Sequence, residues 1–247
     1  MIPLRDANPT RRRALVTIGL IAICIAVYLL EVFVQATSGQ DGFERLIGDW
    51  GLVPARLTGQ GGGDAIGGPP ALLTIFSSMF LHADLLHIGG NMLYLWIFGN
   101  NVEDRLGRPL YLVFYLAGGV LAALAQVAIA PDSAVPVIGA SGAIAAVLGA
   151  YLVLYPRARV QTLVYLGFFY QLIQIPAVVI LGFWFILQVM SAVVSFGDPA
   201  ASGGVALFAH IGGFGGGVLV GLVVRGAGDR GDDGPRLIRP TDRFGVG

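Results

Sequence analysis

Long apolar runs dominate the chain, and within each run the apolar residues are continuous rather than alternating with polar ones. A membrane-spanning helix needs about 20 consecutive apolar residues, whereas the strands of a membrane barrel alternate apolar and polar side chains. The pattern therefore predicts an all-α membrane protein with six spans. The predicted spans cover residues 14–34, 78–98, 110–130, 141–155, 176–196 and 204–224.

The fourth run, from Ser141 to Tyr155, is shorter than the others. At 1.5 Å per residue it makes a helix about 22 Å long, less than the ~30 Å of a bilayer core. One end of this helix is therefore expected inside the membrane. Two further segments are not predicted to span: the Gly-, Asp- and Pro-bearing stretch 35–70 is expected to be a long loop, and 160–174 an interfacial segment.

The six runs form one predicted unit over residues 14–224, after an N-terminal segment at 1–13. The first run could also be interpreted as a cleavable signal peptide. It is longer than the apolar region of such a peptide, and no A-x-A cleavage site follows it, so we predict a retained span. Residues 225–247 are rich in Gly, Asp, Arg and Pro, a composition typical of a disordered tail.

The composition agrees with a membrane protein. Hydrophobic residues make up 55% of the chain, charged residues 12%, and the mean hydropathy is +0.77. Soluble domains carry about 25% charged residues, so a soluble globular domain and a disordered chain are both excluded. A nucleic-acid partner is not expected either, because nucleic-acid binders need a basic face.

Arginine placement predicts the orientation. Thirteen of the 15 basic residues, all of them arginines, lie on one side of the predicted topology, and only Arg45 and Arg56 lie on the other. Because cytoplasmic loops are enriched in basic residues, both termini are predicted to be cytoplasmic. Short loops and a set of basic residues that contains only arginine favour a plasma membrane.

Polar residues inside three predicted spans are the candidates for function, because a polar group in a membrane is costly. In the predicted topology these residues all lie in the outer half of the membrane. They are His82, His87, Asn91, Ser141 and His210.

Ser141 and His210 begin faces of small residues that allow two helices to approach closely. A serine hydroxyl beside a histidine is the minimum for an activated nucleophile. No Asp or Glu lies in the last three predicted spans, so the pair would act as a dyad. Asn91, His87 and the Ser141 amide could stabilise an oxyanion. His82 fits either a water-filled pocket or an ordinary interfacial position.

Four motifs occur in order along the chain: His82-x4-His87-x3-Asn91, Gly99-x3-Glu103-x3-Gly107, Gly139-Ala140-Ser141-Gly142 and Ala209-His210-Ile211-Gly212-Gly213. Together they resemble those of the rhomboid intramembrane serine proteases. The resemblance implies a six-helix rhomboid-like bundle of the bacterial type over residues 14–224, with a short central fourth helix.

The resemblance also implies roles for the candidate residues. Ser141 would be the nucleophile, His210 the general base and acid, and His87 and Asn91 would form the oxyanion hole with the Ser141 amide. The substrates would be membrane-anchored proteins, cut near the outer face of the lipid bilayer, with no cofactor or metal. The fifth span and the loop before the sixth would form a mobile gate. Many members place an aromatic ring four residues after the serine, where this chain has Ala145.

Other functions make different predictions. A zinc protease would use H-E-x-x-H, which is missing between His82 and His87, although three imidazoles could hold a metal. A small-solute transporter or channel would need a polar track through the membrane, but residues 147–154 and 218–224 are apolar. A catalytically silent rhomboid-like binding protein would usually lack the serine or the histidine.

Overall fold

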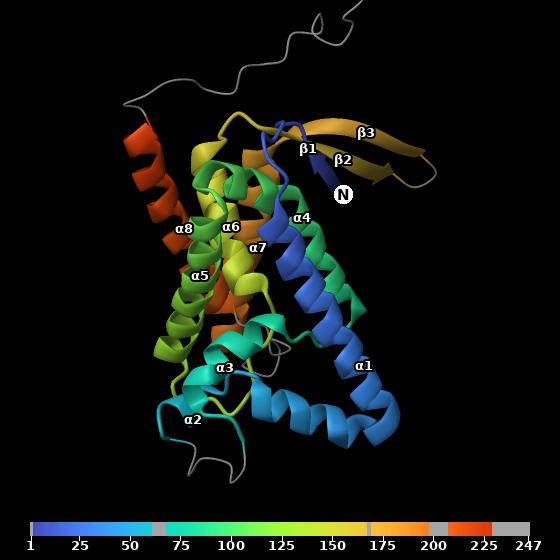
Figure 1. The fold of residues 1–247 in the computed structure, drawn as a ribbon, viewed down its shortest axis with the longest axis vertical. Helices are drawn as coiled ribbons and strands as arrows, with labels where there is room; N and C mark the ends of the chain where they lie inside the picture. The colour runs from blue at the N-terminus through green and yellow to red at the C-terminus, as the bar shows by residue number, and fades with distance from the viewer. Residues whose placement is uncertain (1, 61–67, 167–168, 198–206, 229–247) are drawn as a thin grey trace, which may run out of the picture.

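The computed structural model describes residues 2–60, 68–166, 169–197 and 207–228, which form a helical bundle with a small sheet at one end (Figure 1). The all-α class predicted for the membrane core is confirmed by these helices. They are α1 (Leu15–Trp50), α2 (Pro54–Leu57), α3 (Ala71–Ser77), the 3-10 helix η1 (Ser78–Phe80), α4 (Leu85–Leu106), α5 (Arg108–Ile129), α6 (Ser141–Leu154), α7 (Ala177–Gly197) and α8 (Leu207–Gly228).

Helix α1 is longer than the predicted first span, so the prediction of a loop over all of 35–70 is wrong. The helix bends at Gly39, where φ is 70°, and its second half runs at a steep angle to the first (Figure 1). Phe43, Leu46 and Ile47 are half-buried in that second half. Their spacing of three and four residues places them on one helix face. The loop prediction gave more weight to the surrounding glycines than to this spacing.

The second predicted span also has a different boundary. The apolar run from 78 to 98 includes η1 and a turn, and the axis bends by 82° before α4 begins at Leu85. Asp84 caps α4 by accepting hydrogen bonds from the N–H groups of Leu86 and His87, both at 2.8 Å. A carboxylate at this position satisfies N–H groups that have no partner within the helix. His82 therefore precedes the helix that carries His87 and Asn91.

The remaining predicted spans agree with α5, α6 and α7 to within a few residues. Predicted residues 204–206 of the last span lie outside the described residues, as do 229–247 of the predicted tail. Residues 225–228 belong to α8 and are not disordered. Arg225 lies in the last turn of this helix and donates a hydrogen bond to the Val153 carbonyl at 3.3 Å, and a basic residue there complements the helix dipole.

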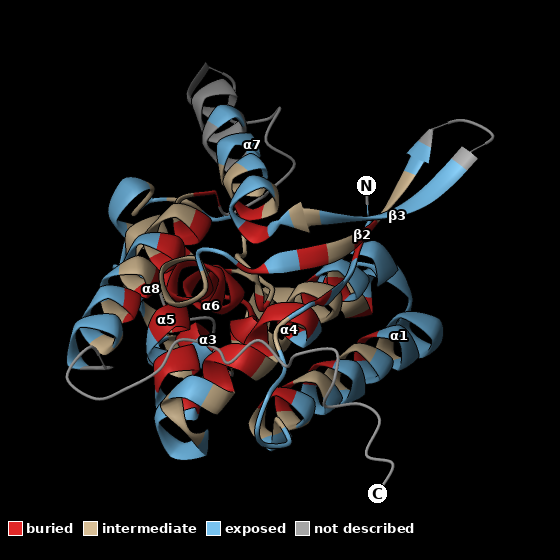
Figure 2. Cartoon of the chain, turned by 90° about the horizontal axis from the view of Figure 1, so that it is seen from above, coloured by how far each residue is buried: buried red, intermediate tan, exposed pale blue. Residues whose placement is uncertain are grey.

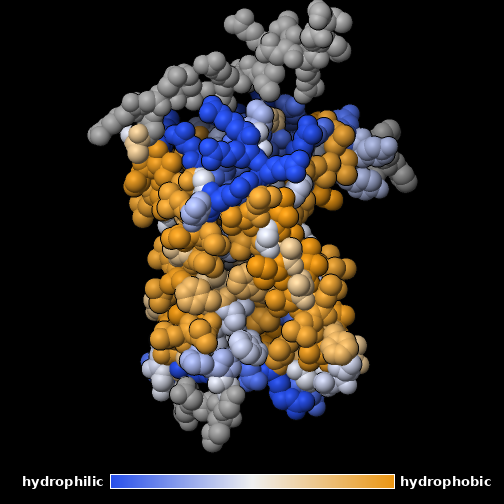
Figure 3. All heavy atoms as spheres, in the orientation of Figure 1, coloured by the Kyte–Doolittle hydropathy of each residue, from blue (hydrophilic) through white to orange (hydrophobic). Residues whose placement is uncertain are grey.

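Three of the described helices, α1, α5 and α8, are long and apolar enough to cross a membrane. The helical segment 71–80 and α4 form a bent pair, which makes a fourth span if the two are counted as one. Helix α6 and residues 177–187 of α7 are apolar but shorter, so the count of six spans stays a prediction. Figure 3 shows the corresponding surface, an apolar belt between two polar ends.

Helix α6 lies at the centre of the bundle, with most of its residues buried (Figure 2). Its closest neighbour is α8, whose Gly213 and Gly217 rest on the carbonyl groups of Gly142 and Ala146. A Cβ atom on either of these α8 glycines would overlap the α6 backbone. The glycine face therefore allows direct backbone contact between the two helices, as small residues do in membrane proteins.

The sheet at the end of the bundle was not anticipated. Strands β1 (Ile2–Asp6), β2 (Arg159–Leu166) and β3 (Phe169–Pro176) are antiparallel in the order β1-β2-β3. The expected interfacial segment at 160–174 is thus a β-hairpin that pairs with the N-terminal segment. Pairing between segments about 150 residues apart leaves no local signal in the sequence.

Asp6 fastens this sheet to the bundle. Its carboxyl accepts hydrogen bonds from the Asn101 amide at 2.5 Å and the Tyr151 hydroxyl at 3.0 Å. The partners belong to the carboxyl-terminal parts of α4 and α6. The sheet therefore covers the end of α6 that is opposite Ser141.

We predict that Gly217→Ala lowers the stability of the protein, because the added methyl group would separate α8 from α6. Overpacking of this kind costs about 1–3 kcal/mol. Thermal unfolding in detergent measures the effect. Gly215→Ala is the matched control, since Gly215 lies on the same helix and a methyl group added there would meet nothing within 4 Å. Equal melting temperatures for the two variants would contradict the packing argument.

We also predict a pH-dependent docking of β1. Burial raises the pKa of Asp6 from 3.8 to about 6, so the docked strand favours the protonated carboxyl. Docking is therefore strongest below about pH 4 and weakens as the pH rises through 6. Hydrogen exchange of residues 2–6, corrected for intrinsic rates, should increase between these pH values in the parent. Asp6→Asn should remove the pH dependence of this exchange. If the pH dependence persisted in the variant, Asp6 would be excluded as its cause.

Candidate active site

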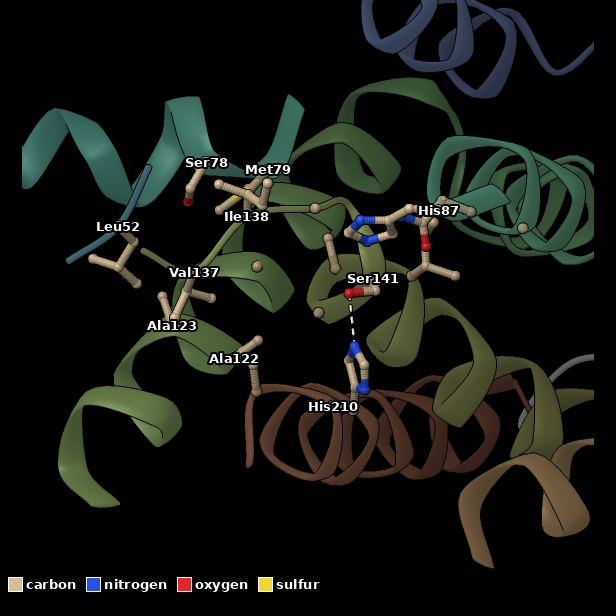
Figure 4. A pocket seen from close by; sticks show the side chains of 18 of the residues that line it. Leu52, Ser78, Met79, His87, Ala122, Ala123, Val137, Ile138, Ser141 and His210 are labelled. Atoms are coloured by element: carbon tan, nitrogen blue, oxygen red, sulfur yellow. Dashed lines mark hydrogen bonds between the residues drawn. The ribbon is translucent and has the colours of Figure 1, made fainter. Parts of the chain in front are cut away.

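A cavity of about 620 Å³ opens between the helices in the half of the bundle away from the sheet. Four of the five predicted site residues line it, and Figure 4 shows three of them gathered at one end of it. These four are His87, Asn91, Ser141 and His210. The rest of the lining, which is mostly apolar but includes Ser78 and Asp84, extends toward Leu52 and Val137.

Ser141 and His210 are in direct contact. The Nε2 atom of His210 lies 2.6 Å from the Oγ atom of Ser141 (Figure 4). Ser141 is the first residue of α6, and His210 lies in the first turn of α8. Because both side chains begin at the same level, the close helix packing described above is sufficient to bring them together. His210 is buried, with 7% of its surface exposed.

Gly139 determines the position of His87 beside Ser141. The φ angle of Gly139 is 119°, a conformation that residues with a Cβ rarely adopt. A Cβ atom there would lie 2.7 Å from Nε2 of His87 and 3.6 Å from the Ser141 hydroxyl. The loop before α6 is held in place by a 2.8 Å hydrogen bond from the Gly139 N–H to the Ser78 carbonyl. Glycine therefore leaves room for the imidazole to reach the serine from the side opposite His210.

Asn91 follows His87 by one helical turn and so lies on the same face of α4. Its side chain is buried, with 8% of the residue exposed. Among the described residues, its Nδ2 atom has no hydrogen-bond acceptor. A buried donor without a partner is costly, and here it belongs to a residue that lines the cavity beside the serine.

His82 does not line the cavity. It is fully buried, its Nδ1 atom lies 3.1 Å from the Phe80 carbonyl, and its ring packs edge-on against His87 at 5.2 Å. Its backbone N–H donates to the carboxylate of Glu31, at 3.0 Å to Oε1 and 3.2 Å to Oε2. The geometry thus makes His82 a neighbour of the site rather than part of its lining.

Glu31 was not among the predicted site residues, although a single carboxylate inside the first apolar run was a usable signal. The residue is 1% exposed, whereas its neighbours Leu30 and Val32 are well exposed. It joins α1 to the turn that leads into α4. At the other end of the same two helices, Glu103 accepts hydrogen bonds from the N–H groups of Val16 and Thr17 at 3.0 and 2.8 Å. Carboxylates therefore fasten α1 at two levels, to the turn before α4 and to α4 itself.

Trp184 was also not predicted as a site residue. It comes from α7, and its ring centroid lies 5.7 Å from that of His210, with the rings tilted by 47°. Position 145 carries only the methyl group of a fully buried alanine, and a Cβ on Gly213 of α8 would lie 3.4 Å from it. The aromatic partner of the histidine thus belongs to a different helix from the one that the resemblance suggested.

The described residues contain no group of three or more His, Cys, Asp and Glu side chains arranged to hold a metal. The polar side chains of the cavity are instead suited to proton transfer and to hydrogen bonding of a developing negative charge.

Comparison with known families adds an independent observation. The family model described as "Rhomboid domain" matches residues 69–227, which is most of the chain and includes every residue that lines the cavity except Leu52. The chain belongs to the rhomboid family. The membrane-spanning character of this rhomboid follows from its family and its apolar helices together.

Individual relatives match shorter parts of this rhomboid. Rhomboid protein 1, mitochondrial, of Saccharomyces cerevisiae is 33% identical over 101 residues, or 38% of this chain and 28% of the relative. The human presenilin-associated rhomboid-like protein, mitochondrial, is 35% identical over 92 residues, covering 36% and 23%. Rhomboid protease GluP of Bacillus subtilis is 37% identical over 78 residues, covering 32% and 15%. The matches therefore span less than a third of these relatives.

We predict that Glu31→Ala is less stable than Glu31→Gln. The amide oxygen of glutamine can still accept the hydrogen bond from His82, whereas alanine leaves that buried N–H without an acceptor, at a cost of about 1–3 kcal/mol. Thermal unfolding of both variants in detergent measures the difference. If the two variants unfolded at the same temperature, a hydrogen-bond acceptor at position 31 would have no role in holding the turn before α4.

Proposed function

We propose that this rhomboid is an intramembrane serine endopeptidase that uses Ser141 and His210 as a catalytic dyad. The observation that carries the proposal is the 2.6 Å contact between His210 Nε2 and Ser141 Oγ in the lining of a cavity. A serine hydroxyl is a weak nucleophile until an adjacent base accepts its proton. The name of the Bacillus subtilis relative, rhomboid protease GluP, supports the same chemistry.

In the proposed reaction, His210 Nε2 accepts the proton of the Ser141 hydroxyl as Oγ attacks the carbonyl carbon of a peptide bond. The negative charge that develops on the carbonyl oxygen is stabilised by hydrogen bonds from Asn91 Nδ2, the His87 ring and the Ser141 amide. His210 then donates its proton to the leaving amine, and the peptide C–N bond breaks. A water molecule, activated by the same histidine, hydrolyses the resulting ester and restores the serine.

The free amide donor of Asn91 supports this oxyanion site, because Nδ2 has no acceptor in the described part of the chain. An approaching substrate oxygen would supply one. The start of α6 would also stabilise the negative charge on the substrate oxygen, because the first N–H groups of a helix have no partners within it and carry a partial positive charge.

The proposed substrates are membrane-anchored proteins cut within or beside their transmembrane segments, because the cavity lies in a bundle with an apolar outer belt (Figure 3). We further propose that residues 14–224 form the catalytic domain and that both termini are cytoplasmic, with the cavity toward the outer face of a plasma membrane. The orientation rests on the arginine distribution alone. The names of the yeast and human relatives contain the word mitochondrial, which describes those two proteins.

The nucleophile can be tested with a fluorophosphonate probe, which forms a covalent bond with an activated serine. Mass spectrometry of the labelled full chain is expected to find the modification at Ser141. Ser141→Ala should lose both labelling and cleavage of a model transmembrane substrate, and His210→Ala should lose most of both because the hydroxyl keeps its proton. A Ser141→Ala protein that cleaves at the parent rate would overturn the proposal. Activity lost to a chelator and restored by zinc would favour a metal enzyme instead.

We predict a positioning role for Trp184 in the same reaction. Removing its ring by Trp184→Ala should lower kcat about 2- to 10-fold, the equivalent of an aromatic contact worth about 0.5–1.5 kcal/mol, with KM little changed. Trp184→Phe should restore most of kcat because a ring remains against His210. Trp96, which is 57% exposed on α4, provides a control in Trp96→Ala. Equal kcat values for the Ala and Phe variants at position 184 would exclude the ring contact.

A further inference from the structure

The β2–β3 hairpin carries an uncovered apolar surface. None of the residues from Val160 to Pro176 is charged. Tyr165 and Tyr170 are paired across the two strands and are 68% and 73% exposed, and Leu172, which pairs with Leu163, is 56% exposed. In soluble surroundings such a hairpin would expose a long uncharged edge strand, which is prone to aggregation.

These side chains lie on one face of the sheet. Residues two apart on a strand, and residues paired across antiparallel strands, project to the same side. Ile2 of β1 pairs with Leu163 and is 51% exposed, so it extends the same face. We name this face the hairpin patch, and it consists of Ile2, Leu163, Tyr165, Tyr170 and Leu172.

The position of the hairpin identifies what surrounds it. The hairpin projects sideways from the sheet end of the bundle, and the view from above shows that it reaches beyond the helices (Figures 1 and 2). In Figure 3 this level is the border between the apolar belt and the polar end. An element that leaves a spanning bundle sideways at this border lies against lipid headgroups, where tyrosine is favoured because its ring is apolar and its hydroxyl is polar.

We propose that the hairpin patch binds the headgroup layer of the bilayer and anchors the start of α7 to the membrane surface. Strand β3 ends at Pro176, and α7 begins at the next residue. The Ala177 N–H donates to the Ala158 carbonyl at 2.8 Å, so both ends of the hairpin are tied together where the helix starts. Trp184 follows about two turns later. The depth of the hairpin in the lipid thus sets the level of the helix that carries the aromatic partner of His210.

The experiment uses the full chain with Cys24→Ala, labelled with the fluorophore NBD at Leu172→Cys, in vesicles of phosphatidylcholine and phosphatidylglycerol. The control label is at Arg157→Cys, because Arg157 is exposed in the turn before β2. At position 172 we expect blue-shifted emission, strong quenching by lipids with a doxyl group near the headgroup, and several-fold weaker quenching by iodide than at position 157. These readouts need no proteolysis, so they are independent of the proposed function.

Variants of the two tyrosines test whether these side chains hold the hairpin in the headgroup layer. Tyr165→Glu combined with Tyr170→Glu should abolish the doxyl quenching at position 172, whereas Tyr165→Phe combined with Tyr170→Phe should retain it. Equal iodide quenching at positions 172 and 157 would overturn the proposal by showing a hairpin in water. Protection from both iodide and doxyl lipids would also overturn it, because the patch would then be covered by protein, such as a second copy of this chain.

Discussion

The site depends on backbone contact between α6 and α8. A serine side chain is short, so a histidine on another helix can reach its hydroxyl only if the two helix axes are unusually close. Gly213 and Gly217 make this approach possible by placing no Cβ atom against the carbonyls of α6. The residue four positions after the serine, Ala145, has only a methyl group, and the ring that packs on His210 comes from Trp184 of α7. The α6–α8 packing thus explains the Ser–His contact, and a third helix supplies the aromatic partner of the histidine.

The two sides of Ser141 are supported by different parts of the molecule. On the His210 side, support comes from the α6–α8 contact. On the His87 side, it comes from the turn before α4, which is capped by Asp84 and held to α1 by the carboxylate of Glu31. Because a carboxylate inside the bilayer region is costly without hydrogen bonds, its bonds to the His82 N–H make the position of this turn well defined. His82 thus supports the site without lining it.

The sheet extends this arrangement to the opposite end of the bundle. Asp6 joins β1 to Asn101 and Tyr151, and the hairpin continues without a linker into α7. The N-terminal segment, the membrane surface proposed for the hairpin patch and the helix that carries Trp184 are therefore mechanically connected. Through α7, this connection provides a physical route from the end of the bundle to the surroundings of His210.

Local sequence patterns determined the helical class, the positions of α5, α6 and α7, and the candidate residues, because continuous apolar runs and costly intramembrane polar groups are visible without tertiary contacts. Only the tertiary structure decided the bend before α4, the pairing of β1 with β2, and the roles of Glu31 and Trp184. Each of these depends on residues far apart in the chain: His82 bonds to Glu31, and the ring of Trp184 packs against His210. The short pattern around such a residue cannot contain its distant partner.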